Sequence, residues 1–256
     1  MKIETRDILY LHLQASERFV ISYGMDFREF AGSLNQGLRN ILLIEHKYED
    51  GEYNLNTLMD YVLQEDLPNL LKQNVSEYID FCWTDFAEES ALNELNGQEI
   101  AELLYLGHCK GHLKPPFYRQ LQNHYVYLAH DDGWFNKVYY RSMDTFFEML
   151  GNLIPGKLDL LKREKSWLGG LRRKAEYGVI PPAGLKELTP LLTEGAAISF
   201  RNMRLSRTKI EIPIWILGDY VNMDDMLDEY SNIVRSEQPA AHFVFNRKTR
   251  EWTLEK

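Results

Sequence analysis

The chain has 256 residues, of which 45% are hydrophobic and 12% aromatic, so it can bury a substantial core in one large domain or two small ones. A formal net charge of −9 argues against a general nucleic-acid binder, and two cysteines, Cys82 and Cys109, are too few for a disulfide framework. No apolar run approaches the ~20 residues of a membrane-spanning helix, and the opening residues lack a secretory cleavage site, so we expect a soluble cytoplasmic protein with no membrane attachment.

Apolar periodicity predicts the first elements of the chain. Alternation with a period of two predicts strands over 6–13 and 18–23. Asp26 with Glu29 three residues later resembles a capping box and predicts the start of a helix. A short apolar run over 40–45 then favours a buried strand. The chain is therefore expected to open as β-β-α-β.

The next segment is expected to alternate between helices and strands. Helical spacing of leucine, methionine and valine predicts a helix over 54–63, and alternating aromatic residues predict a strand over 75–83. A further helix is expected to begin at Asn96 and to end at Gly107.

The stretch from 123 to 150 predicts a β-hairpin followed by a helix. Two tyrosine-rich strands flank the turn His130-Asp131-Asp132-Gly133, and a helix is expected to begin at Ser142 or Asp144 and to end at Gly151. Ile154-Pro155-Gly156 then forms the first strong break in the chain.

The remainder of the chain begins with a basic stretch, rich in Gly-Gly and Pro-Pro pairs, that indicates a connection between subdomains or a functional loop region. A strand is expected over 209–217, where Pro213 would require a sheet edge or a bulge. Asn222 is expected to cap a helix, and strands over 241–245 and 251–254 close the chain around a polar turn.

These elements predict an α+β fold with a largely antiparallel mixed sheet, short packed helices and a smaller C-terminal α/β part. The expected division is an N-terminal α+β part over 1–154, a basic connecting region over 155–208 and a C-terminal strand-helix-hairpin part over 209–256. All three could also form one domain.

Charge is distributed unevenly along the chain. Residues 1–156 carry 12 Lys+Arg against 24 Asp+Glu, residues 157–209 carry 12 against 5, and residues 210–256 carry 5 against 9. Arginine forks suit phosphate and carboxylate groups, so the basic segment is a candidate site for an anion or an acidic partner. The candidate residues are Arg172, Arg173, Lys174, Arg201, Arg204 and Arg207. The simpler interpretation is that they pair with acids of the same fold.

One cluster of histidine and cysteine could bind a metal. Cys109-x-x-His112 has the spacing of half a zinc site, and the hairpin turn could bring further ligands to it. The candidate ligands are His108, Cys109, His112, His130 and Asp131. Ordinary surface histidines are the simpler interpretation, because a structural zinc site normally has four ligands.

No sequence motif identifies a catalysed reaction. The chain has no phosphate-binding Gly-x-x-x-x-Gly-Lys-Ser/Thr loop, no dinucleotide fingerprint and no Gly-x-Ser-x-Gly elbow. The leading hypothesis is a non-catalytic binding or regulatory protein that engages a protein partner or an anionic small molecule through the 157–209 region. The alternative is a hydrolase, metal-dependent or not, with a site near His108–His112 and His130–Asp132. A nucleic-acid accessory factor is the third reading. No cofactor is strongly implied.

Overall fold

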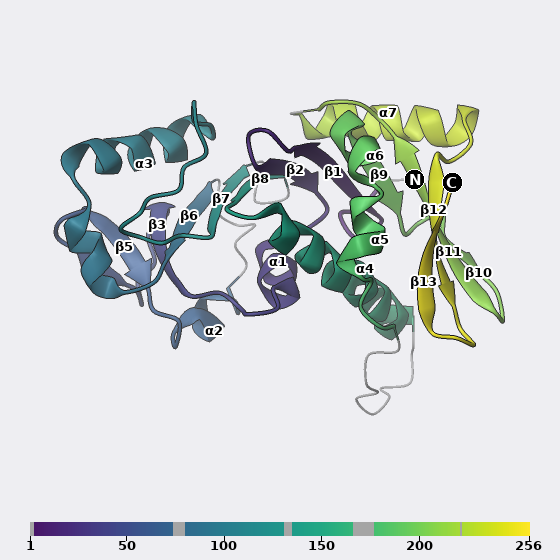
Figure 1. Ribbon diagram of the computed structural model, residues 1–256, viewed down its shortest axis with the longest axis horizontal. Helices are drawn as coiled ribbons and strands as arrows, with labels where there is room; N and C mark the ends of the chain where they lie inside the picture. Colours follow the sequence, from purple (N-terminus) through teal and green to yellow (C-terminus); the bar gives the residue numbers. More distant parts are fainter. Residues whose placement is uncertain (1–2, 74–79, 131–134, 166–176, 221) are drawn as a thin grey trace.

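The computed structural model describes residues 3–73, 80–130, 135–165, 177–220 and 222–256. One long sheet runs through the middle of the molecule, and helices cover both of its faces (Figure 1). The strands are β1 (Ile8–Gln14), β2 (Phe19–Tyr23), β3 (Asn40–Glu45), β4 (Glu52–Asn54), β5 (Met59–Val62), β6 (Phe81–Phe86), β7 (Tyr125–His130), β8 (Phe135–Tyr140), β9 (Ala196–Ser199), β10 (Arg204–Leu205), β11 (Lys209–Ile216), β12 (Ala241–Asn246) and β13 (Glu251–Glu255). The helices are α1 (Phe27–Ser33), α2 (Leu67–Leu70), the 3-10 helix η2 (Glu89–Glu94), α3 (Gly97–Cys109), α4 (Met143–Lys165), α5 (Pro182–Lys186), α6 (Thr189–Glu194) and α7 (Met223–Ser236).

The sheet has thirteen strands, and every pairing between the described strands is antiparallel. Its order is β13-β12-β11-β9-β1-β2-β8-β7-β6-β3-β5-β4, with β10 paired to β11 beside this path. The first strand, β1, joins the two halves of the chain, because it pairs with β2 on one side and with β9 on the other. The predicted α+β fold is confirmed, and the C-terminal strands extend the same sheet.

Side chains that alternate along the strands form two apolar layers, one on each face of the sheet. In β1, Leu9 and Leu11 belong to the layer covered by α1, α2, α4, α5 and α6. Ile8 and Tyr10 belong to the opposite layer, which is covered by η2, α3 and α7. Both faces of the central strands are therefore buried, which explains their nearly continuous apolar sequence.

Three of the predicted helix starts are confirmed by their capping hydrogen bonds. Asp26 Oδ1 accepts from the backbone N–H of Glu29 at 2.7 Å, and Glu29 Oε2 accepts from the backbone N–H of Asp26 at 3.2 Å. Asn96 and Glu99 form the same reciprocal box at the start of α3. Asn222 caps α7 through two backbone N–H groups of its first turn. Each cap satisfies donors that a helix start leaves without partners.

The helix predicted over 54–63 is wrong, because this segment forms the β4–β5 hairpin. Asn54 Oδ1 accepts a hydrogen bond from the backbone N–H of Thr57 at 2.9 Å, and Leu58 has a φ of 57°, so the chain turns tightly here. The side chains of Leu55 and Leu58 are 83% and 69% exposed. Their helical spacing in the sequence therefore marks no buried face.

The helix stop predicted at Gly151 and the break predicted at Pro155 are also wrong, because α4 continues through both residues. Pro155 has no N–H and cannot donate to the carbonyl of Gly151 one turn earlier. The backbone N–H of Ile180 donates to that carbonyl instead, at 3.0 Å. A Cβ at Gly151 would lie 2.4 Å from Ile180 O, so the glycine permits this approach. The helix thus crosses the expected boundary at residues 154 and 155, while the division into domains stays a prediction.

Gly107 does not end α3, which continues to Cys109 and is capped by Lys110 in the left-handed conformation at φ 51°. A Cβ at Gly107 would lie 2.7 Å from Ile44 Cγ2 on β3. The glycine therefore lets α3 pack closely on the sheet.

Pro213 does not lie at an edge of the sheet. It is in β11, which pairs with β12 on one side along Lys209–Ile214. On the other side, β10 pairs with residues up to Glu211 and β9 pairs from Ile214 onward. Pro213 falls in the gap between these two partners, where a missing N–H leaves the ladders intact.

Candidate functional site

Three of the six predicted basic residues lie in the described part of the chain, and their environments differ. Arg201, which follows β9, is half-buried, and its Nη1 lies 3.7 Å from Asp7 Oδ2. Arg204 and Arg207 are exposed on the β10–β11 hairpin. Arg172, Arg173 and Lys174 lie outside the described residues.

Three lysines of the 157–209 region already have carboxylate partners. Lys157 Nζ lies 2.7 Å from Glu29 Oε1, and its side chain is only 4% exposed. Lys186 pairs with Asp144 at 2.7 Å, and Lys209 pairs with Glu211 at the same distance. For these residues, neutralisation within the fold is the better interpretation. Among the basic side chains of this region whose burial the structure describes, the remaining positive charge is on the β10–β11 hairpin.

A second hairpin adds basic residues beside the first. The backbone N–H of Arg247, in the β12–β13 turn, donates to the carbonyl of Thr208 at 2.8 Å, and Lys209 lies opposite Asn246 in the ladder. The tips of the β10–β11 and β12–β13 hairpins therefore lie together at one end of the molecule (Figure 1). We call this surface the basic hairpin end, and its residues are Arg204, Arg207, Lys209, Arg247, Lys248 and Arg250.

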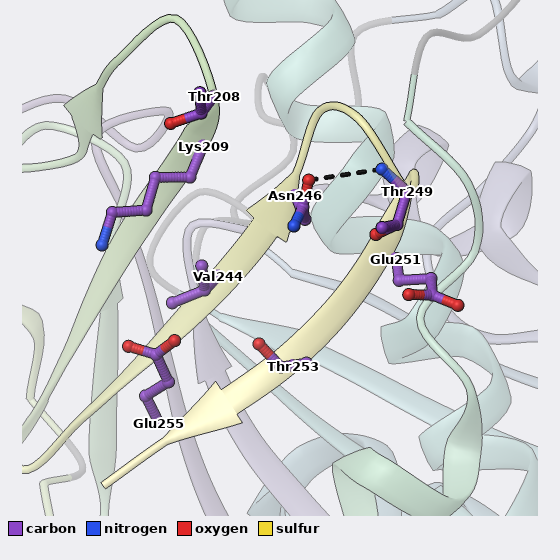
Figure 2. Close-up of a pocket in the computed structure, with 8 residues that line it drawn as sticks. All are labelled: Thr208, Lys209, Val244, Asn246, Thr249, Glu251, Thr253 and Glu255. Carbon is purple, nitrogen blue, oxygen red and sulfur yellow. Dashed lines mark hydrogen bonds between the residues drawn. The ribbon is translucent and has the colours of Figure 1, made fainter.

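Side-chain hydrogen bonds fix both tips. Ser206 Oγ accepts from the backbone N–H of Lys209 at 2.9 Å, which tightens the first turn. Asn246 Oδ1 accepts from the N–H groups of Lys248 at 2.9 Å and Thr249 at 3.3 Å, the latter drawn in Figure 2. Turns of this kind hold the backbone while the basic side chains extend into solvent.

A shallow hollow of about 250 Å³ lies beside the tips on the polar face of β11, β12 and β13 (Figure 2). This face is opposite the apolar layer formed by Phe243 and Phe245, because side chains alternate along β12. The hollow is lined by Thr208, Lys209, Val244, Asn246, Thr249, Glu251, Thr253 and Glu255. It offers hydroxyl and amide groups and two carboxylates, but no nucleophile activated by a neighbouring base.

The charges of the basic hairpin end are partly compensated. A hydrogen bond from Lys209 lowers the pKa of Glu211, against the effect of burial, and Glu211 raises the pKa of Lys209 in return. Arg204 lies directly opposite Glu211 in the β10–β11 ladder. No carboxylate of the described residues lies within ion-pair distance of Arg207 or Lys248. These two side chains can therefore pair with a ligand without losing an internal partner.

The candidate metal ligands are only partly described. His108 and Cys109 are exposed in the last turn of α3, and His112 follows the helix with its Nε2 3.8 Å from Glu102 Oε2. Among the described residues, no three histidine, cysteine or carboxylate side chains are grouped so that they could hold a metal. The side chain of His130 and all of Asp131 lie outside that part of the chain.

The sequence predicts the polar turn that follows β12 but gives no reason to assign Arg247, Lys248 or Arg250 to a site. The β11–β12 register brings this turn beside Thr208, and that register links segments far apart in the sequence. The available signal was the alternation of side chains over 209–217 and 241–245, which predicts two strands. If these strands pair antiparallel, the turn before β11 and the turn after β12 lie at the same end of the sheet.

A comparison of the chain with protein-family models, curated proteins and solved structures found no match. None of the helices in the described ranges combines the length and the apolar character needed to cross a membrane.

Proposed function

We propose that the chain is a non-catalytic binding protein that engages an acidic segment of a protein partner through the basic hairpin end. The observation that carries the proposal is the hydrogen bond between Arg247 and Thr208, which holds two arginine-bearing hairpin tips side by side. Arg207 and Lys248 supply charges without an internal partner among the described residues, and guanidinium groups suit carboxylates.

The distribution of acids favours a short acidic peptide over a nucleic acid. Glu211, Glu251 and Glu255 lie on the same strands as the basic tips, and the whole chain carries a net charge of −9. A continuous phosphate backbone would run from the tips into these carboxylates and into the acidic molecule beyond them. A peptide can instead place its carboxylates at the tips and uncharged or basic residues over the hollow.

A direct test is the binding of fluorescein-labelled poly-L-glutamate, followed by fluorescence anisotropy. The triple variant Arg207→Glu, Arg247→Glu and Lys248→Glu is expected to bind at least about tenfold more weakly, because each reversal replaces an attraction of a few tenths of a kcal/mol with a repulsion. Binding by the unchanged protein should also weaken as salt is added, since these charges are exposed and easily screened.

A matched control separates the local effect from the change in total charge. The variant Lys47→Glu, Lys72→Glu and Lys114→Glu has the same net charge, and its three positions are exposed in the first half of the chain. It should retain the affinity of the unchanged protein. Equal loss in both variants, or tighter binding of a single-stranded DNA oligonucleotide than of poly-L-glutamate, would contradict the proposal.

A further inference from the structure

A second hollow, which is lined by basic residues, lies in the acidic N-terminal part of the chain, far in the sequence from the basic hairpin end. It has a volume of about 410 Å³ and is lined by Phe117, Arg119, Gln122, His124 and Arg141. We call it the arginine pocket. Four of the lining residues come from the loop before β7, the fifth is Arg141, which follows β8, and no carboxylate lines the pocket.

Arg141 is fixed in place by backbone and amide groups. Its Nε donates to the carbonyl of Asn123 at 2.6 Å, and its guanidinium lies 5.3 Å from the centre of the Phe117 ring. Asn123 is fully buried and is itself held by hydrogen bonds to Thr84 and Pro116. A guanidinium held in this way loses little conformational freedom when it binds a ligand.

One acid that interacts with the residues around the pocket, Asp85, is already engaged. Asp85 is 1% exposed and accepts from the backbone N–H groups of His124 and Tyr125, each at 2.7 Å. It also accepts from Arg39 Nη2 at 2.6 Å. Asp85 therefore neutralises Arg39. No ion pair joins Arg119 or Arg141 to a carboxylate among the described residues.

The surroundings of His124 lower the pKa of its ring. Burial lowers the pKa of His124, and Arg39 and Arg141 act in the same direction against the opposing effect of Asp85. The His124 imidazole lines the pocket together with two arginines and can donate a further hydrogen bond to an anion. Gln122 offers a neutral amide donor.

From this geometry we infer that the arginine pocket binds the phosphate group of a small molecule. A phosphate carries close to two negative charges at neutral pH, which matches the two guanidinium groups that have no carboxylate partner among the described residues. Its three free oxygens can accept from Arg119, Arg141 and one of the neutral donors, whereas a carboxylate has only two oxygens. Phosphate can come from the free ion or from a phosphate monoester, and the Phe117 ring would contact the organic part of a monoester.

The test is an NMR titration of the ¹⁵N-labelled full chain with inorganic phosphate, phenyl phosphate and acetate. Saturable shifts of the amide of His124 and of the Arg119 side-chain N–H are expected with a phosphate compound, and the tighter of the two phosphate compounds identifies the source. Arg119→Ala should weaken this binding by about tenfold, because it removes one charge-assisted hydrogen bond to the ligand, and the exposed position of Arg119 lets the fold tolerate the change.

The control variant is Arg207→Ala at the basic hairpin end, which should bind phosphate like the unchanged protein. Unchanged affinity in Arg119→Ala would overturn the assignment of the pocket, and equal binding of acetate would overturn the assignment to phosphate. Absence of saturable shifts with both phosphate compounds would also overturn it. None of these outcomes bears on poly-L-glutamate binding at the other end of the molecule.

Discussion

The two cysteines have opposite environments in the folded chain. Cys82 lies in the interior strand β6 and is fully buried, whereas Cys109 is exposed at the end of α3. Burial raises the pKa of the Cys82 thiol to about 12, although Lys110 acts in the opposite direction. Since the thiolate is the reactive form, Cys82 is expected to be inert in the folded protein.

Thiol titration with a chromogenic disulfide at pH 8 checks this expectation. The folded protein should show rapid reaction of Cys109 alone, and Cys82 should react only after unfolding in urea. In the variant Cys109→Ser the rapid phase should disappear. A rapid phase that survives in this variant would mean that Cys82 is accessible and that β6 is not an interior strand.

At the residue scale, the sequence predicts local chemistry well and remote contacts poorly. Asp26 and Asn96 are recognisable as helix caps because their partners lie three residues away. Arg141 has no such signal, because its contacts are with Asn123 and Phe117 across the hairpin and its loop. The arginine pocket could therefore not be predicted from the sequence.

At the scale of elements, the role of a glycine in a helix also depends on contacts that are remote in the sequence. Gly151 and Gly156 are both interior to α4, and each resembles a helix stop in the sequence. Only the packing distinguishes them, because a Cβ at Gly151 would meet Ile180 O at 2.4 Å, whereas a Cβ at Gly156 would meet nothing within 4 Å. The break predicted around Pro155 failed because the segment at Ile180 supplies the missing hydrogen bond.

Alanine substitutions at these two glycines should change stability in opposite directions. Gly156→Ala is expected to raise the free energy of unfolding by about 0.5–1 kcal/mol, since glycine in a helix interior carries an entropic penalty of that size. Gly151→Ala is expected to lower it by about 1–3 kcal/mol, because the added methyl group clashes with backbone. Urea denaturation monitored by circular dichroism measures both, and shifts of the same sign would contradict the packing of α4.

Strands proved predictable where the alternation of residues and a turn signal agree. The β1–β2, β7–β8 and β12–β13 hairpins occur where alternation predicts them, because the turn and the strand period agree. The β4–β5 hairpin was missed because Leu55 and Leu58 project into solvent at helical spacing. Apolar periodicity identifies an element only when the apolar residues are the buried ones.

At the scale of the whole molecule, the basic surface in the structure has different members from the basic 157–209 segment of the sequence. Most of the described lysines and arginines of the 157–209 region pair with acids or face one across a ladder. The sheet instead combines Arg207 with Arg247 and Lys248 from the C-terminal block, whose net charge is negative. Block charges in the sequence therefore indicate a basic surface but do not identify its members.

If the two hairpin tips form the recognition surface, an NMR titration with unlabelled poly-L-glutamate should perturb them more than any other part of the chain. The largest amide shifts are predicted at 204–209 and 246–250, with smaller or no shifts along α3 and α4. Shifts confined to other surfaces, or spread evenly over the molecule, would contradict the claim.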